Sequence, residues 1–117
     1  MNPETGANEE RQTAAVYDYV RTIPTGRVLS YGEVGQAVGA SARAVGWALS
    51  FCPEGVPWQR VVGADGYLRI AKRSPHLKAV QKKLLEDEGI MLDDRDRVER
   101  RFFLAEEDGP PQTTLGL

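Results

Sequence analysis

Residues 30–51 read SYGEVGQAVGASARAVGWALSF, and this stretch predicts two short helices joined by a tight turn. Ser30 and Glu33 have the spacing of a capping box, in which each side chain accepts a hydrogen bond from the other residue's backbone N–H. Gly39 is suited to end the first helix, and Ser41 is suited to cap the second. Such a pair is typical of a helix-turn-helix, although two helices of this kind can also pack together without binding DNA.

The second helix of this pair has one face suited to a core and one side with few side-chain atoms. The core-facing positions are Val45, Ala48 and Leu49. The nearly bare side is made by Ala42, Ala44 and Gly46. Glycine inside a helix costs roughly 1 kcal/mol relative to alanine. We therefore expect the backbone of this helix to approach another surface closely, with Arg43 and Trp47 on the exposed face.

The limits of the folded domain are set by the pattern of apolar residues. Their helical spacing predicts a first helix over residues 9–22. Residues 1–8 are polar, and we expect a flexible N-terminus there. Residues 105–117 contain acids and two adjacent prolines without an apolar pattern, and we expect a disordered tail. The folded domain is thus predicted at residues 9–104.

The segments after residue 57 predict a small β-ribbon and a last helix. Asp65-Gly66 favours a tight turn, so residues 60–62 and 67–70 are predicted to form a β-hairpin or wing. Ser74-Pro75 is a typical helix start. The expected buried face of that helix consists of Leu77, Val80, Leu84 and Leu85. The predicted fold class is α/β and mostly helical, with a single winged helix-turn-helix-like domain and a short β-hairpin.

The composition restricts the class of protein. A chain of 117 residues fits one domain, and its 41% hydrophobic content suits an ordinary soluble core. No apolar run is long enough to span a membrane. A single cysteine, Cys52, cannot form an internal disulfide, which fits a cytoplasmic protein. His76 is the single histidine, and no cluster has metal-ligand spacing, so we expect no metal and no cofactor.

The charge is distributed unevenly along the chain. Residues 1–85 hold 11 basic and 7 acidic side chains, a net charge of +4, whereas residues 86–117 hold 4 basic and 10 acidic ones, a net charge of −6. A basic stretch without acids extends from Arg69 to Lys83. Such a stretch can contact phosphates even on an acidic protein, but a solvated helix face has the same appearance.

Five short motifs together resemble the alkylguanine-DNA alkyltransferase family. They are Ile23-Pro24-Thr25-Gly26, Ser30-Tyr31-Gly32, Ala42-Arg43-Ala44-Val45-Gly46, Pro57-Trp58-Gln59-Arg60-Val61 and Leu84-Leu85 with Glu88-Gly89. Each motif is weak alone, but the five stand in the family's order and spacing. The fourth motif reads Pro-Cys-His-Arg-Val in the reactive enzymes. With Trp58 in place of the cysteine and Gln59 in place of the histidine, the chain resembles the alkyltransferase-like proteins.

The resemblance implies a role for each site residue. Arg43 would enter the base stack from the minor groove and fill the gap left by an everted nucleotide. Tyr31 would help to rotate the adjacent phosphate and would contact the flipped base. The close-approach surface would consist of Ala42, Ala44 and Gly46. The lesion pocket would consist of Tyr31, Trp58, Val61 and Arg69. Whether Arg69 or Lys72 contacts the alkylated base is left open by the sequence.

The implied function is recognition without catalysis. An indole has no nucleophile for an alkyl carbon, and an amide cannot act as a base near neutral pH. The chain is thus expected to bind O6-alkylguanine in double-stranded DNA as a monomer, flip it, and mark it for nucleotide excision repair proteins. Two alternatives remain. One is a winged-helix regulator without lesion specificity, and the other is a methyltransferase that uses Cys52, a residue outside the motif.

Overall fold

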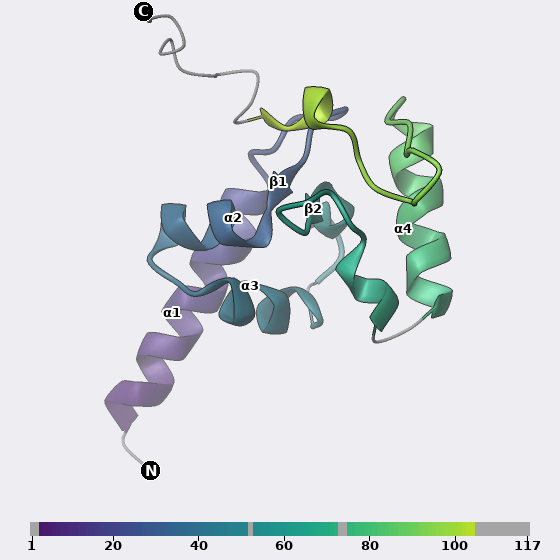
Figure 1. The fold of residues 1–117 in the computed structure, drawn as a ribbon. Coiled ribbons are helices and arrows are strands. Elements are labelled where there is room, and N and C mark those ends of the chain that lie inside the picture. The colour runs from purple at the N-terminus through teal and green to yellow at the C-terminus, as the bar shows by residue number, and fades with distance from the viewer. Residues whose placement is uncertain (1–2, 52, 73–74, 105–117) are drawn as a thin grey trace, which may run out of the picture.

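The computed structural model describes residues 3–51, 53–72 and 75–104, and it shows a small helical domain with a short parallel two-stranded sheet. Three helices gather on one side of the sheet and a fourth lies on the other (Figure 1). The helices are α1 (Pro3–Val20), α2 (Tyr31–Val38), α3 (Ala42–Leu49) and α4 (Pro75–Asp87), and the strands are β1 (Leu29–Ser30) and β2 (Val61–Val62). Single 3-10 turns occupy Trp58–Arg60, Arg69–Lys72 and Arg100–Phe102.

The helix-turn-helix predicted from residues 30–51 is confirmed, with its caps. Ser30 Oγ accepts from the backbone N–H of Glu33 at 3.0 Å, and Glu33 Oε1 accepts from the N–H of Ser30 at 2.9 Å. Gly39 ends α2 with φ at 77°, a left-handed conformation that glycine adopts without strain. Ser41 Oγ then caps α3 by accepting from the N–H of Ala44 at 3.0 Å.

The predicted β-hairpin is wrong in its strand pairing. β2 pairs in parallel with β1, in a register that sets Leu29 opposite Val61. The turn itself forms, since the N–H of Gly63 donates to Tyr67 O at 2.9 Å. The chain then continues into the 3-10 turn Arg69–Lys72 in place of a second strand. Both residues of β2 are fully buried, as is typical of a parallel strand covered on both faces.

The two strands lie where two hydrophobic clusters meet. Leu29 and Val61 belong to the cluster formed with α1, α2 and α3. Val28 and Val62 belong to the cluster formed with α4 and the C-terminal segment, which includes the fully buried Phe103. Side chains alternate across a strand, so β2 contributes to both clusters. The chain at β1 does so through Leu29 and through Val28, one residue before the strand. The segment that follows Pro57 is therefore held from two sides.

The ends of the chain differ in part from the sequence-based expectation. α1 begins at Pro3, so it includes most of the segment expected to be a flexible N-terminus. The expected tail at residues 105–117 lies outside the described residues. Before it, residues 90–104 return to the sheet, where the N–H of Leu104 donates to Val28 O at 2.9 Å. None of the helices in the described part of the chain is both long and apolar enough to cross a membrane.

The buried face of α4 is also corrected. Leu85 is fully buried as expected, but Leu77 is 38% exposed and Gln81 is only 1% exposed. Gln81 belongs to the interior because its side-chain amide finds backbone partners there, as described below. The predicted cap at Ser74 lies outside the described residues.

Two glycines in left-handed turns give a matched test of this packing. Gly66 has φ of +85°, and a Cβ there would overlap the backbone carbonyl of Val98. Gly55 has φ of +92°, with nothing within 4 Å of such a Cβ. Both substitutions by alanine strain the backbone by roughly 1–2 kcal/mol. We expect Gly66→Ala to lower the free energy of unfolding by at least about 2 kcal/mol more than Gly55→Ala, because it also separates the 63–67 turn from Val98.

Urea unfolding followed by circular dichroism measures this difference, with the wild-type chain as reference. Equal losses for the two variants would show that the contact between the 63–67 turn and the C-terminal segment adds nothing to stability.

Candidate nucleic-acid interface

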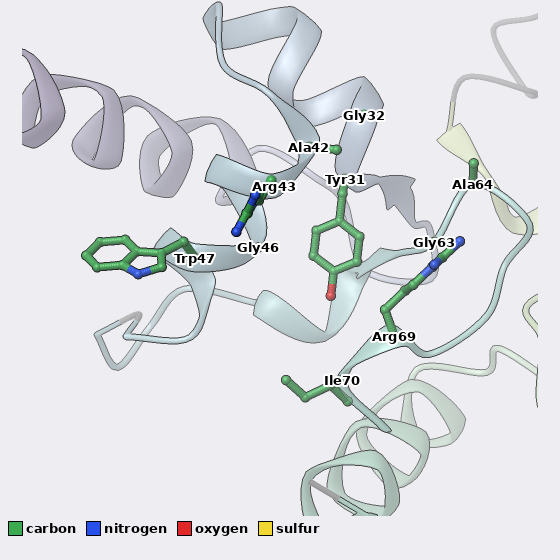
Figure 2. Close-up of a pocket in the computed structure, with 10 residues that line it drawn as sticks. All are labelled: Tyr31, Gly32, Ala42, Arg43, Gly46, Trp47, Gly63, Ala64, Arg69 and Ile70. Atoms are coloured by element: carbon green, nitrogen blue, oxygen red, sulfur yellow. The ribbon is translucent and has the colours of Figure 1, made fainter. Parts of the chain in front are cut away.

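A pocket of about 660 Å³ opens between α3 and the segment that follows β2 (Figure 2). α2 contributes its first turn, α3 contributes its exposed face, and the chain after β2 closes the other side. The lining residues are Tyr31, Gly32, Ala42, Arg43, Gly46, Trp47, Gly63, Ala64, Arg69 and Ile70. The volume lies in the range of small-molecule sites, roughly 300–1,000 Å³.

The structure brings together most of the site residues expected from the sequence. Those that line the pocket are Tyr31, Ala42, Arg43, Gly46 and Arg69. Ala44, Trp58 and Val61 are not among the lining residues. Ala44 is half-buried on α3, and Trp58 is half-buried in the 3-10 turn before β2. Val61 is fully buried, and its carbonyl accepts from Gln81 Nε2 at 3.2 Å.

The bare side of α3 is not explained by packing inside the molecule. A Cβ added at Gly46 would meet the Tyr31 ring at 3.9 Å, an ordinary contact. Alanine would therefore fit, and the fold itself does not require glycine at this position. Ala42 and Arg43 beside it are exposed. This arrangement favours a surface that an external partner approaches closely.

Arg69 stands on the opposite wall of the pocket, where Gly63 leaves room for its side chain. Its Nε lies 2.6 Å from the position that a Cβ would take at Gly63, so a larger residue would displace the guanidinium.

Asp65, in the turn beside Arg69, carries a negative charge. A hydrogen bond from the N–H of Tyr67 is the main cause that lowers the pKa of Asp65, and the charge of Arg69 lowers it further. Asp65 is thus ionised at neutral pH and partly offsets the charge of Arg69. The Lys72 side chain lies outside the described part of the structure, so the choice between Arg69 and Lys72 stays open.

One carboxylate joins three of the sequence motifs, a feature that the sequence analysis missed. Glu88 Oε2 accepts from Gln59 Nε2 at 2.8 Å, and Glu88 Oε1 accepts from the N–H of Gly26 at 2.9 Å. Arg60 Nε donates to both carboxylate oxygens, at 3.0 and 3.1 Å. Arg60 also donates to the carbonyl of Ile23 at 2.8 Å. The sequence did contain a signal for this contact, because the residues that meet at Glu88 belong to three of the five motifs.

Gln81 was also missed, because it stands on a helix face read as apolar. Its Nε2 donates to the carbonyls of Gln59 and Val61, at 3.1 and 3.2 Å. These bonds tie α4 to the backbone of residues 59–61.

The described residues contain no group of three or more His, Cys, Asp or Glu side chains able to hold a metal ion.

The family of the chain follows from its sequence. The family model for the DNA-binding domain of 6-O-methylguanine DNA methyltransferase matches residues 11–90, a range that includes α2, α3, β2 and α4. The chain belongs to this family. Its relatives include DNA base-flipping and alkyltransferase-like proteins, and it is itself an alkyltransferase-like member of the family.

The similarity to individual members of this family is substantial. Alkyltransferase-like protein 1 of Schizosaccharomyces pombe is 43% identical over 82 residues, which are 66% of this chain and 74% of the relative. A DNA base-flipping protein of Thermus thermophilus is 51% identical over 55 residues, which are 45% of this chain but only 37% of that protein. The crystal structure of S. pombe Atl1 in complex with damaged DNA containing O6-carboxymethylguanine superposes with a TM-score of 0.69, at 31% identity, over 84% of this chain and 93% of that one.

Substitutions at the adjacent residues Asp87 and Glu88 should differ strongly in their effect on the free energy of unfolding. The Arg60 and Glu88 side chains are only 16% and 9% exposed. Removing one member of a buried pair leaves the other charge without compensation. We expect Glu88→Ala to lower the free energy of unfolding by about 3 kcal/mol or more. Chemical denaturation followed by circular dichroism is the measurement.

Asp87→Ala is the matched control, at the last residue of α4 and directly before Glu88. Asp87 pairs with Lys83 at 2.7 Å, but these side chains are 57% and 72% exposed. Exposed pairs contribute little, so we expect a loss within about 0.5 kcal/mol. Similar losses for Asp87→Ala and Glu88→Ala would show that the Glu88 cluster is no more than a surface ion pair.

Proposed function

We propose that the chain is a non-enzymatic reader of O6-alkylguanine in duplex DNA. In this proposal it scans the minor groove, flips the damaged nucleotide into the pocket between α3 and the segment after β2, and holds it. The observation that supports this most directly is chemical. The pocket is present with Arg43 in its lining. Trp58 stands where the reactive members of the family have an acceptor cysteine.

Alkyl transfer is disfavoured at two positions. Transfer needs a thiolate that attacks the alkyl carbon and a group that removes the thiol proton. Trp58 supplies neither sulfur nor any other nucleophile. Gln59 keeps a hydrogen bond to Glu88 at 2.8 Å, but its amide donates in that bond and cannot take up a proton. Cys52, the residue of the alternative methyltransferase hypothesis, lies outside the described residues.

The side chains around the pocket suit base extrusion. Arg43 is exposed on α3 and stands between Trp47 and Tyr31 in Figure 2. Its planar cation can stack on bases and donate several hydrogen bonds, which offsets part of the few kcal/mol that extrusion costs. The Tyr31 ring projects into the space between α3 and Arg69, where it can meet an everted base (Figure 2).

The face of α3 argues for the minor groove and against a sequence-reading regulator. Base readout in the major groove needs long polar side chains on the recognition helix. α3 reads ARAVGWAL, and Arg43 is its single long polar residue. The minor groove is only about 6 Å wide, so a helix with small side chains is the kind that can approach it. We propose in addition that the bound complex marks the lesion for nucleotide excision repair, because a binder without chemistry leaves the damage in place.

Lesion preference is the first test of this function. We expect the chain to bind a short duplex with O6-methylguanine more tightly than the same duplex with guanine, measured by fluorescence anisotropy.

Arg43→Ala should weaken lesion binding about tenfold or more and reduce the signal of a fluorescent base analogue that reports flipping. Arg95→Ala is the charge-matched control, because Arg95 is exposed, follows α4 in the chain and does not line the pocket.

Two outcomes would contradict the proposal. Equal affinity for both duplexes would leave a general DNA-binding module. Unchanged flipping in Arg43→Ala would remove Arg43 from its assigned role, even if the lesion preference remained.

Restoring a sulfur at the acceptor position tests the account of the lost reaction. Trp58→Cys supplies a thiol, but only a few per cent of an unperturbed thiol is ionised at pH 7. Gln59 cannot remove the proton, because an amide does not act as a base near neutral pH. We expect little or no methyl transfer by this variant, and slow transfer by Trp58→Cys combined with Gln59→His. Mass spectrometry of the protein after incubation with methylated DNA measures the transfer.

Trp58→Ser is the matched control, since it opens the same space without a thiol. The wild-type chain should also keep its mass unchanged. Fast transfer by Trp58→Cys alone would show that Gln59 is no barrier, and a methyl group on the wild-type chain would overturn the non-enzymatic assignment.

A further inference from the structure

Two large aromatic side chains next to the pocket are exposed to solvent. Trp47 is 59% exposed and Phe51 is 67% exposed. Their ring centroids lie 5.0 Å apart, with 59° between the ring planes, so they form one apolar surface. Among the described residues, Leu77 and Met91 are also large, apolar and exposed, but both lie on or after α4. An exposed aromatic pair of this size is typical of a contact surface.

The pair continues the line of α3 that begins with Arg43. Arg43 and Trp47 are four residues apart on α3, so they share one side of the helix and lie about 6 Å apart along its axis. Phe51 lies beyond the end of α3, and its ring contact with Trp47 extends the same surface. Trp47 lines the same pocket as Arg43. Figure 2 shows its indole at the rim and directed away from Tyr31. The indole therefore does not close the space in which a flipped base would lie. It is available to a partner that binds the exposed side of α3.

We infer that Trp47 and Phe51 form an apolar wedge against the minor-groove edge of the duplex, beside the step that Arg43 enters. This inference rests on the proposed function, because Arg43 sets the position of α3 on the DNA. Double-stranded DNA is the favoured occupant because the aromatic surface is continuous with the pocket. Any duplex that receives Arg43 in its stack also meets the indole about one helical turn further along α3.

The two ends of α3 would then act differently on the groove. The bare first turn, with Ala42 and Ala44, lets the backbone come close. The indole at Trp47 adds bulk on the same side of the helix, and we expect it to widen the minor groove where it contacts the duplex. Apolar wedges in the minor groove partly unstack a base step and bend the duplex toward the major groove. The pair thus supplies the bend that favours extrusion, and contributes affinity that does not depend on the alkyl group.

Three variants test this inference on two duplexes, one with O6-methylguanine and one with guanine. Trp47→Ala should weaken binding to both by roughly tenfold or more, as expected for loss of an aromatic–base contact. It should also reduce the bend, measured by energy transfer between dyes at the duplex ends. Trp47→Phe should keep most of the affinity and bend. Met91→Ala is the matched control, because Met91 is 58% exposed but lies beyond α4, and it should change neither.

The dependence of affinity on salt separates an apolar contact from an altered charge contact. Loss of a phosphate contact lowers the slope of log affinity against log salt by about one, whereas loss of an apolar contact leaves it unchanged. We expect Trp47→Ala to keep the wild-type slope. A lowered slope would overturn the inference, because the substitution would then act through a cation such as Arg43.

Unchanged affinity and bend in Trp47→Ala would also overturn the inference and assign the pair to a different partner, such as another protein. The proposed function is judged separately, by the preference of the wild-type chain for the damaged duplex. If that preference is absent, weaker binding of Trp47→Ala to the guanine duplex with a reduced bend still supports the wedge.

Discussion

The carboxylate of Glu88 is the constraint on which the site depends. A carboxylate with 9% of its side chain exposed has lost most of its hydration and must be compensated by donors. Its donors come from the loop before β1 and from the turn before β2, through Gly26, Gln59 and Arg60. Because Glu88 itself follows α4, one group ties α4 to the two segments that lead into the sheet. These two segments continue into β1 and β2, which pair in parallel.

Two walls of the pocket are formed by the segments that follow β1 and β2 in the chain. β1 leads through the capping box at Ser30 directly into α2, which places Tyr31 at the mouth of the pocket. β2 leads through the turn at Gly63 to Arg69 on the opposite wall. α3 packs on α1 and α2 through Val45 and contributes its exposed side. The pocket is therefore built on elements held by the core, and Tyr31, Arg43 and Arg69 are the polar and charged side chains that line it.

The parts of this arrangement that are local in sequence could be predicted, and the long-range parts could not. The caps at Ser30 and Ser41 need only a few neighbouring residues, so their pattern was sufficient to predict α2 and α3. Pairing β1 with β2 joins two-residue strands about thirty positions apart, and no local pattern encodes it. Asp65-Gly66 correctly predicted a turn, but a turn does not determine which strand β2 joins. Gln81 was assigned no role because its partners are backbone carbonyls, which every sequence contains.

The substitution at Gln59 separates the structural role of this position from its chemical one. The side chain there must donate a hydrogen bond to Glu88, and the Gln59 amide does so at 2.8 Å. A histidine in the reactive sequence could donate in the same way, but it could also exchange a proton, which an amide cannot. The cluster around Glu88, the sheet and the pocket can thus persist after the acid–base function has gone.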